Sequence, residues 1–180
     1  NGGKTMKKKL IGKNTLIVLS IITLGLAATI LANFLGSSDV KAVVPGGNVP
    51  DGTYYIVNQN SGKALDNGGS TSNASVMIQF QPYNGNINQK WNLEHLGGNK
   101  YKVISAMSNQ ALDVYGGSLD NGAAIIQWPY GGGENQKWYF ESLGTAYPAY
   151  VIKSALPGEA IDVTGGSQSN GVQLVQWVLN

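Results

Sequence analysis

From residue 51 onward the chain consists of short alternating runs of apolar and polar residues, separated by glycine and asparagine. Residues 97–143 show this best, with the runs YKVISA (101–106), ALDVY (111–115), AIIQW (124–128) and QKWYFES (136–142). Alternation with β-branched and aromatic residues predicts strands. No run after Ala42 keeps the period of an amphipathic helix beyond two turns. We therefore expect an all-β domain over residues 51–180.

The pattern occurs three times. KALDNGGSTSNASVMIQF (63–80), QALDVYGGSLDNGAAIIQW (110–128) and EAIDVTGGSQSNGVQLVQW (159–177) share one layout, and NQKWNL (88–93) recurs as NQKWYF (135–140). Paired glycines after each aspartate predict turns with positive φ. Repeats of about 45 residues cannot each bury an apolar face alone, so three should share one core. We place them at about 51–96, 97–143 and 144–180, with the third truncated before an NQKW segment.

The two QxW segments, Gln89–Trp91 and Gln136–Trp138, follow LDN or LDV and a glycine pair. This arrangement resembles the ricin B-type lectin family over about residues 51–180, which implies a β-trefoil fold. It also implies that each repeat builds a sugar site from its aspartate, the aromatic residue after a glutamine, and the Asn-Gln before tryptophan. The implied carbohydrate-binding residues are Asp113, Trp128, Asn135 and Gln136 in the second repeat, Asp66, Phe80, Asn88 and Gln89 in the first, and Asp162 and Trp177 in the third.

The chemistry of these residues suits a sugar ring. A carboxylate accepts two hydroxyl hydrogen bonds, and an aromatic ring covers the apolar face. The second repeat has the complete set, whereas the first has Asn67 in place of valine and the smaller Phe80. The family often has glutamine two positions before the aromatic residue. In this chain that position holds Ile78, Ile126 and Val175. The resemblance therefore does not imply a preference for galactose.

Structural roles compete with sugar binding at these positions. The aspartates can instead accept hydrogen bonds from the glycine turns that follow them. Gln89 and Gln136 can instead satisfy buried backbone groups. Trp91 and Trp138 alternate with apolar neighbours, so we expect them in the core. The candidate auxiliary contacts, which follow the aromatic residues, are Tyr83 and Tyr130.

The N-terminal part predicts an export signal. Residues 6–42 combine a lysine-rich start, an apolar helix over 15–35 and a small residue, Ala42, at the expected cleavage position. An uncleaved membrane anchor is the alternative, because about 20 apolar residues can span a bilayer. Residues 1–5 form a non-native or upstream tail, and residues 43–50, rich in proline and glycine, form a linker. We expect a secreted protein, or a cell-surface one if the anchor is retained.

Composition narrows the function. Residues 43–180 contain six lysines against nine acids, which argues against nucleic-acid binding. The chain has no cysteine, one histidine and no nucleotide, metal or nucleophile motif, so we expect no cofactor, no metal and no catalytic residues. The recurring aspartates occur once per repeat, whereas a glycosidase needs two facing carboxyl groups.

These observations predict a secreted, non-catalytic lectin module that binds glycans or polysaccharide, and that contacts membrane only through an uncleaved N-terminal segment. The alternatives are a β-trefoil scaffold for protein–protein interaction, and a targeting module from a secreted glycosidase or toxin.

Overall fold

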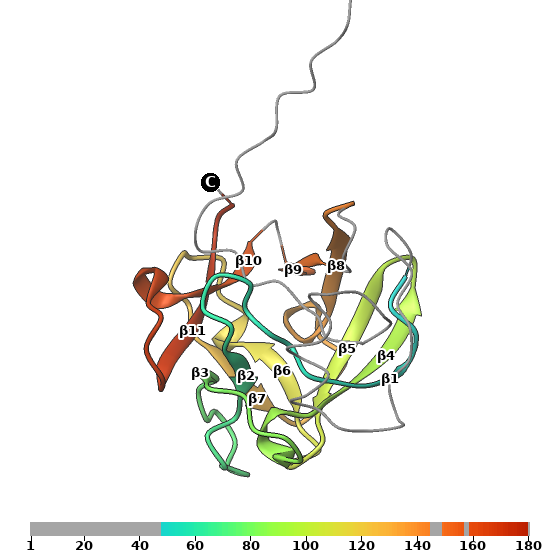
Figure 1. Cartoon of the computed structure of the whole chain (residues 1–180). Helices are drawn as coiled ribbons and strands as arrows, with labels where there is room; N and C mark the ends of the chain where they lie inside the picture. Colours follow the sequence, from blue (N-terminus) through green and yellow to red (C-terminus); the bar gives the residue numbers. More distant parts are fainter. Residues whose placement is uncertain (1–47, 145–148, 157–158, 180) are drawn as a thin grey trace, which may run out of the picture.

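The computed structural model describes residues 48–144, 149–156 and 159–179, and this part is built from short strands and single 3-10 turns (Figure 1). The expected export signal and most of the linker lie outside the described residues. Within the described ranges no helix is long and apolar enough to cross a membrane. The strands are β1 (Gly52–Tyr54), β2 (Ala64–Asp66), β3 (Ile78–Phe80), β4 (Trp91–Gly97), β5 (Lys100–Ser105), β6 (Ala111–Val114), β7 (Ile125–Trp128), β8 (Trp138–Ser142), β9 (Tyr150–Ser154), β10 (Ala160–Val163) and β11 (Val172–Trp177). The 3-10 turns are η1 (Ile87–Gln89), η2 (Tyr115–Gly117), η3 (Glu134–Gln136) and η4 (Thr164–Gly166).

Five strands form the wall of a barrel. β1, β4, β5, β8 and β9 follow one another as antiparallel neighbours. The two long ladders have the same starting register, with Trp91 opposite Ser105 in β4–β5 and Trp138 opposite Ser154 in β8–β9. Each of these ladders joins the last strand of one repeat to the first strand of the next. Consecutive repeats are therefore linked by strand pairing and are not stacked as separate units.

The other six strands form three hairpins with one register. Asp66 lies opposite Ile78 in β2–β3, Asp113 opposite Ile126 in β6–β7, and Asp162 opposite Val175 in β10–β11. A slip of one residue would turn every side chain to the other face, so a shared register places equivalent residues alike in all three repeats. The three-unit β-trefoil predicted from the repeats is confirmed.

The shared core contains the tryptophans of the NQKW segments. Trp91 and Trp138 are fully buried, together with Tyr101 and Tyr150 of the barrel strands. Each indole Nε1–H donates to a backbone carbonyl oxygen of the preceding hairpin, from Trp91 to Leu65 at 3.1 Å and from Trp138 to Leu112 at 3.0 Å. The prediction that both tryptophans belong to the core is confirmed.

A buried glutamine of each repeat holds a loop of another repeat. Gln79, Gln127 and Gln176 are fully buried, and each is the last residue but one of the second strand of its hairpin. Each side-chain Nε2 donates to two main-chain carbonyls that lie 55 to 90 residues away in sequence. The acceptors are Ser167 and Ser169 for Gln79 (2.8 and 2.9 Å), Ser70 and Ser72 for Gln127 (2.8 and 3.0 Å), and Ser118 and Asp120 for Gln176 (2.8 and 3.0 Å). A glutamine of the third repeat therefore binds a loop of the second repeat, one of the second binds a loop of the first, and one of the first binds a loop of the third.

Glycine supplies the turn after each hairpin aspartate. Gly116 and Gly165 lie within η2 and η4 at φ 63° and 64°, a left-handed conformation that a side chain disfavours. The predicted positive φ of these turns is confirmed.

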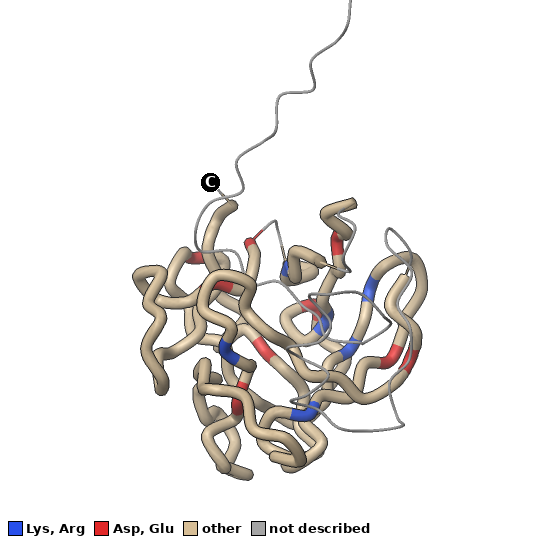
Figure 2. Tube along the Cα trace, in the orientation of Figure 1, with Lys and Arg blue, Asp and Glu red and all other residues tan. Residues whose placement is uncertain are grey.

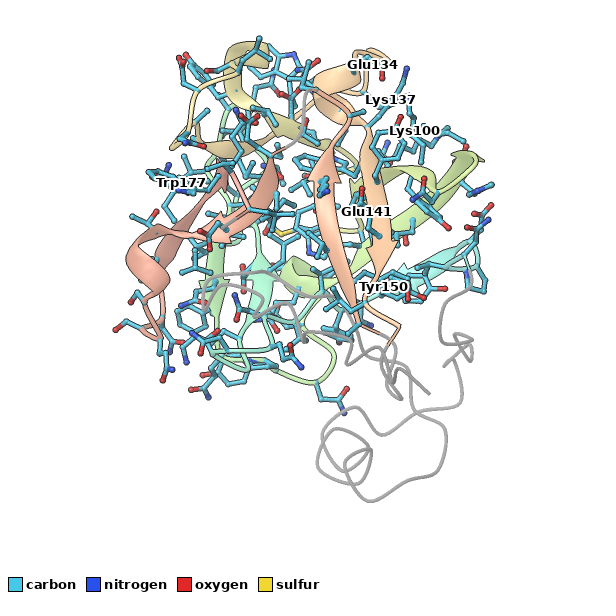
Figure 3. The ribbon with its side chains drawn as sticks, turned by 90° about the horizontal axis from the view of Figure 1, so that it is seen from above. Lys100, Glu134, Lys137, Glu141, Tyr150 and Trp177 are labelled. Carbon is cyan, nitrogen blue, oxygen red and sulfur yellow. The ribbon has the colours of Figure 1, made fainter. Side chains whose placement is uncertain are left out.

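The positions of the charged residues are scattered over the described part of the chain (Figure 2). Four lysines form ion pairs on the barrel surface, and Figure 3 shows Lys100, Glu134 and Lys137 grouped together. Exposed pairs of this kind stabilise the fold only slightly. The pairs are Lys100–Glu134, Lys102–Glu94, Lys137–Glu134 and Lys153–Glu141.

Candidate functional site

The hairpin β6–β7 of the second repeat places an acid and an aromatic ring on one face. Asp113 lies opposite Ile126, and Trp128 follows two residues along the same strand. Side chains two apart on a strand share a face, and diagonal cross-strand neighbours lie about 7–8 Å apart, within reach of long side chains. Trp128 is 43% exposed and Asp113 only 3%. The site therefore offers a broad indole to solvent beside the edge of a recessed carboxylate.

Two amides clamp the Asp113 carboxylate. Asn135 Nδ2 donates to its Oδ1 and Gln136 Nε2 donates to its Oδ2, both at 2.8 Å. The two residues are consecutive in η3, so one turn presents both donors. Each carboxylate oxygen can accept a further hydrogen bond, because it has two lone pairs and only one amide donates to it. The carboxylate is thus held in one orientation with acceptor capacity left over.

Backbone groups in turn hold the Gln136 amide. Its Oε1 accepts from the backbone N–H of Gly131 at 2.7 Å and of Gly132 at 3.2 Å, while its Nε2 also donates to Pro129 O at 2.9 Å. These contacts fix which end of the amide faces Asp113. They also show that protein groups occupy every donor and acceptor of the Gln136 amide, so its contribution to the site is to orient the Asp113 carboxylate.

The electrostatics of Asp113 follow from this environment. Burial raises the pKa of the carboxyl group, and the hydrogen bonds from Gln136 and Asn135 oppose that rise. The amides favour the charged form because they donate to it. The pKa of Asp113 stays above its ordinary value, because the two amides offset only part of the cost that burial imposes on the charged form.

The first repeat builds a different version. Gln89 Nε2 donates to Asp66 Oδ2 at 2.8 Å, as in the second repeat, but Asp66 Oδ1 accepts from the backbone N–H of Gly68 at 2.7 Å. Asn88 contributes its backbone carbonyl, which accepts from Asn67 N at 3.2 Å. Asp66 therefore accepts a hydrogen bond from the glycine turn, as the structural alternative predicted, and a second one from the Gln89 side chain.

The aromatic side of the first site is a pair of rings. Phe80 shares the face of Asp66, by the same register argument, and its ring centroid is 6.3 Å from that of Tyr83. Phe80 is partly buried, whereas Tyr83 is exposed. The candidate auxiliary residue therefore extends the surface that Phe80 offers.

The third repeat places Asp162 and Trp177 on one face, and no side-chain amide of the described residues donates to Asp162. Asp162 Oδ1 accepts from the backbone N–H of Val163 at 2.7 Å. Burial raises the pKa of Asp162 to about 6, opposed only by that backbone hydrogen bond. Trp177 is 40% exposed and lies at the rim of the molecule in Figure 3. Among the described residues this repeat therefore supplies the aspartate and the aromatic ring of the predicted site, but not the Asn-Gln pair.

Sequence reasoning missed two parts of the second site. It did not assign a role to Gly131 and Gly132, although three consecutive glycines before Glu134 were a visible signal. It also did not foresee that the Lys102 ammonium lies 5.2 Å from the ring centroid of Tyr130, close enough for a cation–π contact. Tyr130, a candidate auxiliary contact, is therefore tied to the barrel.

The titratable groups outside these sites do not form a metal centre. Within the described part of the chain, no three of the His, Cys, Asp and Glu side chains are arranged to hold a metal ion. The chemistry that the geometry does offer is hydrogen-bond acceptance next to an exposed ring.

Solved structures share this fold. A designed 3-fold symmetric protein, ThreeFoil, is 40% identical with a TM-score of 0.68, covering 72% of this chain and 91% of its own. An exo-beta-1,3-galactanase from Clostridium thermocellum is also 40% identical with a TM-score of 0.65, and the match covers 72% of this chain and 28% of the enzyme. A lectin of Polyporus squamosus, bound to the epitope Neu5Aca2-6Galb1-4GlcNAc, is 24% identical with a TM-score of 0.62 over 73% of this chain and 45% of the lectin.

No curated protein matches the chain. The family described as ricin-type beta-trefoil lectin domain-like matches it twice, over residues 43–128 and 87–177, which together span most of the sequence. The two overlapping matches follow the internal repeats, and the fold and hairpin register agree with them. The chain therefore belongs to the ricin-type β-trefoil lectin domain-like family.

Proposed function

We propose that the domain is a carbohydrate-binding module without catalytic activity, and that the second repeat is its principal site. The observation that carries this proposal is the Asp113 carboxylate, clamped by Asn135 and Gln136 beside the exposed indole of Trp128. Membership of a lectin-like family and the 40% identity to part of a galactanase support it.

The chemistry of a sugar fits this pair of groups. The ring hydroxyls donate to the remaining lone pairs of the carboxylate, and charge-assisted hydrogen bonds are about twice as strong as neutral ones. The C–H face of the ring packs on the indole of Trp128, which supplies area at little entropic cost because it has two side-chain torsions. Asp113 is recessed, so the hydroxyl that reaches it must project from the edge of the ring.

The two other repeats supply weaker sites on the same body. Asp66 with Phe80 forms the second, and Asp162 with Trp177 forms the third. Linked weak sites gain affinity when neighbouring units of one polymer engage them together. We therefore propose a polysaccharide as the ligand class, bound more tightly than its monosaccharide.

The proposal excludes glycoside hydrolysis by these sites. A glycosidase needs two carboxyl groups on either side of the scissile bond. The pKa of Asp113 is shifted by burial and by the amides of Gln136 and Asn135, and no second carboxylate of the described residues contributes to the shift. Asp113 is thus arranged to hold a hydroxyl rather than to exchange a proton with a partner acid.

We further propose that residues 6–42 direct export, with cleavage after Ala42, so that the domain acts outside the cell. The lysine-rich start, apolar run and small residue of the sequence support this. Mass spectrometry of the protein recovered from a culture medium tests it. A chain beginning at Val43 is expected, and a chain that stays with the membrane at full mass contradicts it.

A glycan array followed by titration with the best polysaccharide tests the binding proposal. Trp128→Ala is expected to weaken binding about tenfold, because a stacking contact of about 1.4 kcal/mol corresponds to that factor. Leu96→Ala is the matched control, since Leu96 is 39% exposed and lies on β4, outside the three sites. If wild type and both variants are equally silent on all glycans, the protein-interaction alternative is favoured instead.

A further inference from the structure

A loop of the first repeat lies beside the exposed indole of the second repeat. Ala74 N donates to Gln127 O at 3.0 Å, and Gln127 N donates to Ser75 O at 3.0 Å. Trp128 directly follows Gln127, so these two main-chain hydrogen bonds hold the loop next to the Trp128 backbone. The aromatic ring of the principal site therefore has a neighbour that belongs to another repeat.

The same main-chain contact recurs in the two other repeats. Gln176 O accepts from Gly122 N at 2.9 Å, and Gln79 O accepts from Gly171 N at 2.8 Å. By the shared hairpin register, these two glutamines occupy the place of the glutamine that Ala74 binds. The two glycines are therefore the counterparts of Ala74.

Ala74 adopts a backbone conformation that suits glycine better. Its φ is 61°, against 85° for Gly122 and 77° for Gly171. A β-carbon disfavours this left-handed region, whereas glycine adopts it freely. Among the described residues, Asn109 is the one other non-glycine residue with a positive φ, at 58°. Residues strained in this way cluster at functional sites, which directs attention to what the Ala74 methyl group does.

The third repeat shows what a methyl group at this position contacts. A β-carbon added to Gly122 would lie 3.5 Å from Cζ3 of the Trp177 indole, an ordinary van der Waals distance. At Gly171, where the ring of the neighbouring hairpin is the smaller Phe80, an added β-carbon would have no neighbour within 4 Å. A methyl group here thus reaches a tryptophan but not a phenylalanine.

The second repeat combines the tryptophan with the methyl group. Trp128 and Trp177 follow equivalent glutamines and are similarly exposed. Ala74 is half-buried, whereas Gly122 is exposed. The equivalence of the two repeats therefore places the Ala74 methyl group against the Trp128 indole.

We propose that Ala74 is a positioning residue of the sugar-binding site in the second repeat, and that its methyl group packs on the Trp128 indole and restricts the rotation of that ring. This inference rests on the proposed function, because a fixed indole matters to a ligand that stacks on it. A ring that rotates freely loses that freedom when a sugar packs on it, and a ring already held in place loses less. The first repeat thus contributes to the site of the second.

Fluorine NMR of the chain labelled with fluorinated tryptophan tests the contact without a glycan. The four tryptophans give separate lines, and Trp128→Phe identifies the line of Trp128. Ala74→Gly is expected to shift the Trp128 line alone, because that ring loses its neighbour. Gly122→Ala is expected to shift the Trp177 line, and Gly171→Ala is expected to shift neither. An unmoved Trp128 line in Ala74→Gly would overturn the proposal.

Ala74→Gly should also change affinity and stability differently. The affinity for the polysaccharide that binds best on the glycan array is expected to fall about threefold, because the freed indole must be ordered on binding. The Tm is expected not to fall, because glycine relieves the strained φ. Asn109→Gly is the matched control, since it relieves the same kind of φ outside the three sites and should leave the affinity unchanged.

The outcomes separate this inference from the proposed function. A parallel loss of Tm and affinity in Ala74→Gly would show a general loosening of the fold and would overturn the positioning role. If Trp128→Ala weakens glycan binding and Ala74→Gly does not, the proposed function stands and the role of Ala74 is refuted. If the wild-type chain binds no glycan, the proposed function fails and the role of Ala74 in binding fails with it.

Discussion

Replacing Asp162 by asparagine should stabilise the fold at pH 8 and have little effect at pH 4. The carboxyl pKa is about 6 in the folded chain against an ordinary 3.8, because burial penalises its charged form. A carboxyl group with a raised pKa binds its proton more tightly when folded, so its contribution favours folding at low pH and is lost as the pH rises from about 4 through 6. Asparagine keeps the oxygen that accepts from Val163 N and carries no charge.

The magnitude follows from the two pKa values. A rise from 3.8 to about 6 corresponds to about 3 kcal/mol, since one pKa unit is worth about 1.4 kcal/mol. Asp162 is only half-buried, and solvent screening reduces this to about 1–2 kcal/mol. The asparagine variant is therefore expected to gain about 1–2 kcal/mol of unfolding free energy at pH 8 and close to none at pH 4.

Urea denaturation of wild type and variant at both pH values measures this difference directly, because subtraction removes the titration of the other acids. Asp120→Asn is the control, since it makes the same change of side chain at an exposed position. A gain of equal size at pH 4 and pH 8 would show that shape rather than charge is responsible. A loss at pH 8 would show that the carboxylate is stabilising as it stands.

Three other substitutions test the parts of the fold that hold the site. Gln127→Leu removes both amide donors to loop carbonyls of the first repeat and is expected to cost about 2–4 kcal/mol by urea denaturation; a cost below 0.5 kcal/mol would refute the role given to this side chain. Trp138→Phe leaves the buried Leu112 carbonyl without its donor and should lower the unfolding free energy by about 2–4 kcal/mol, and an unchanged Tm would contradict it. Gly133→Ala brings a Cβ against Asn135 Oδ1, so Asn135 must turn away from Asp113. Glycan affinity should fall severalfold in calorimetry with little change in Tm, whereas unchanged affinity would show that Asn135 is dispensable.

The repeat pattern predicted the architecture because it determines local register. The same spacing from aspartate to aromatic residue in each hairpin brings Asp113 and Trp128 to one face, whatever the rest of the chain does. Alternation likewise predicted that Trp91 and Trp138 face the core. The bounds of β6 and β7 agree with the expected strands to within one residue. The alternation along a strand and the length of a turn depend on residues close together in the chain, so a single sequence is enough to predict them.

The sequence did not predict how the hydrogen bonds differ between equivalent sites. Asp66 and Asp113 occupy the same place in nearly the same motif, yet the Oδ1 of Asp66 accepts from Gly68 N and that of Asp113 accepts from Asn135. Which donor reaches the oxygen depends on side-chain torsions and on the turn that positions the asparagine. The partners of Gln127 were equally hidden, because alternation tells which face a residue takes and not which distant loop lies across from it.

The interlocking glutamines have a consequence for how the repeats can diverge. Each of them recognises main-chain carbonyls of a loop in another repeat, and a carbonyl is the same whatever side chain its residue has. The loops beside the binding faces can therefore exchange their side chains without loosening the assembly. Three repeats with one hairpin register can in this way carry different surface side chains while remaining joined through their main chains.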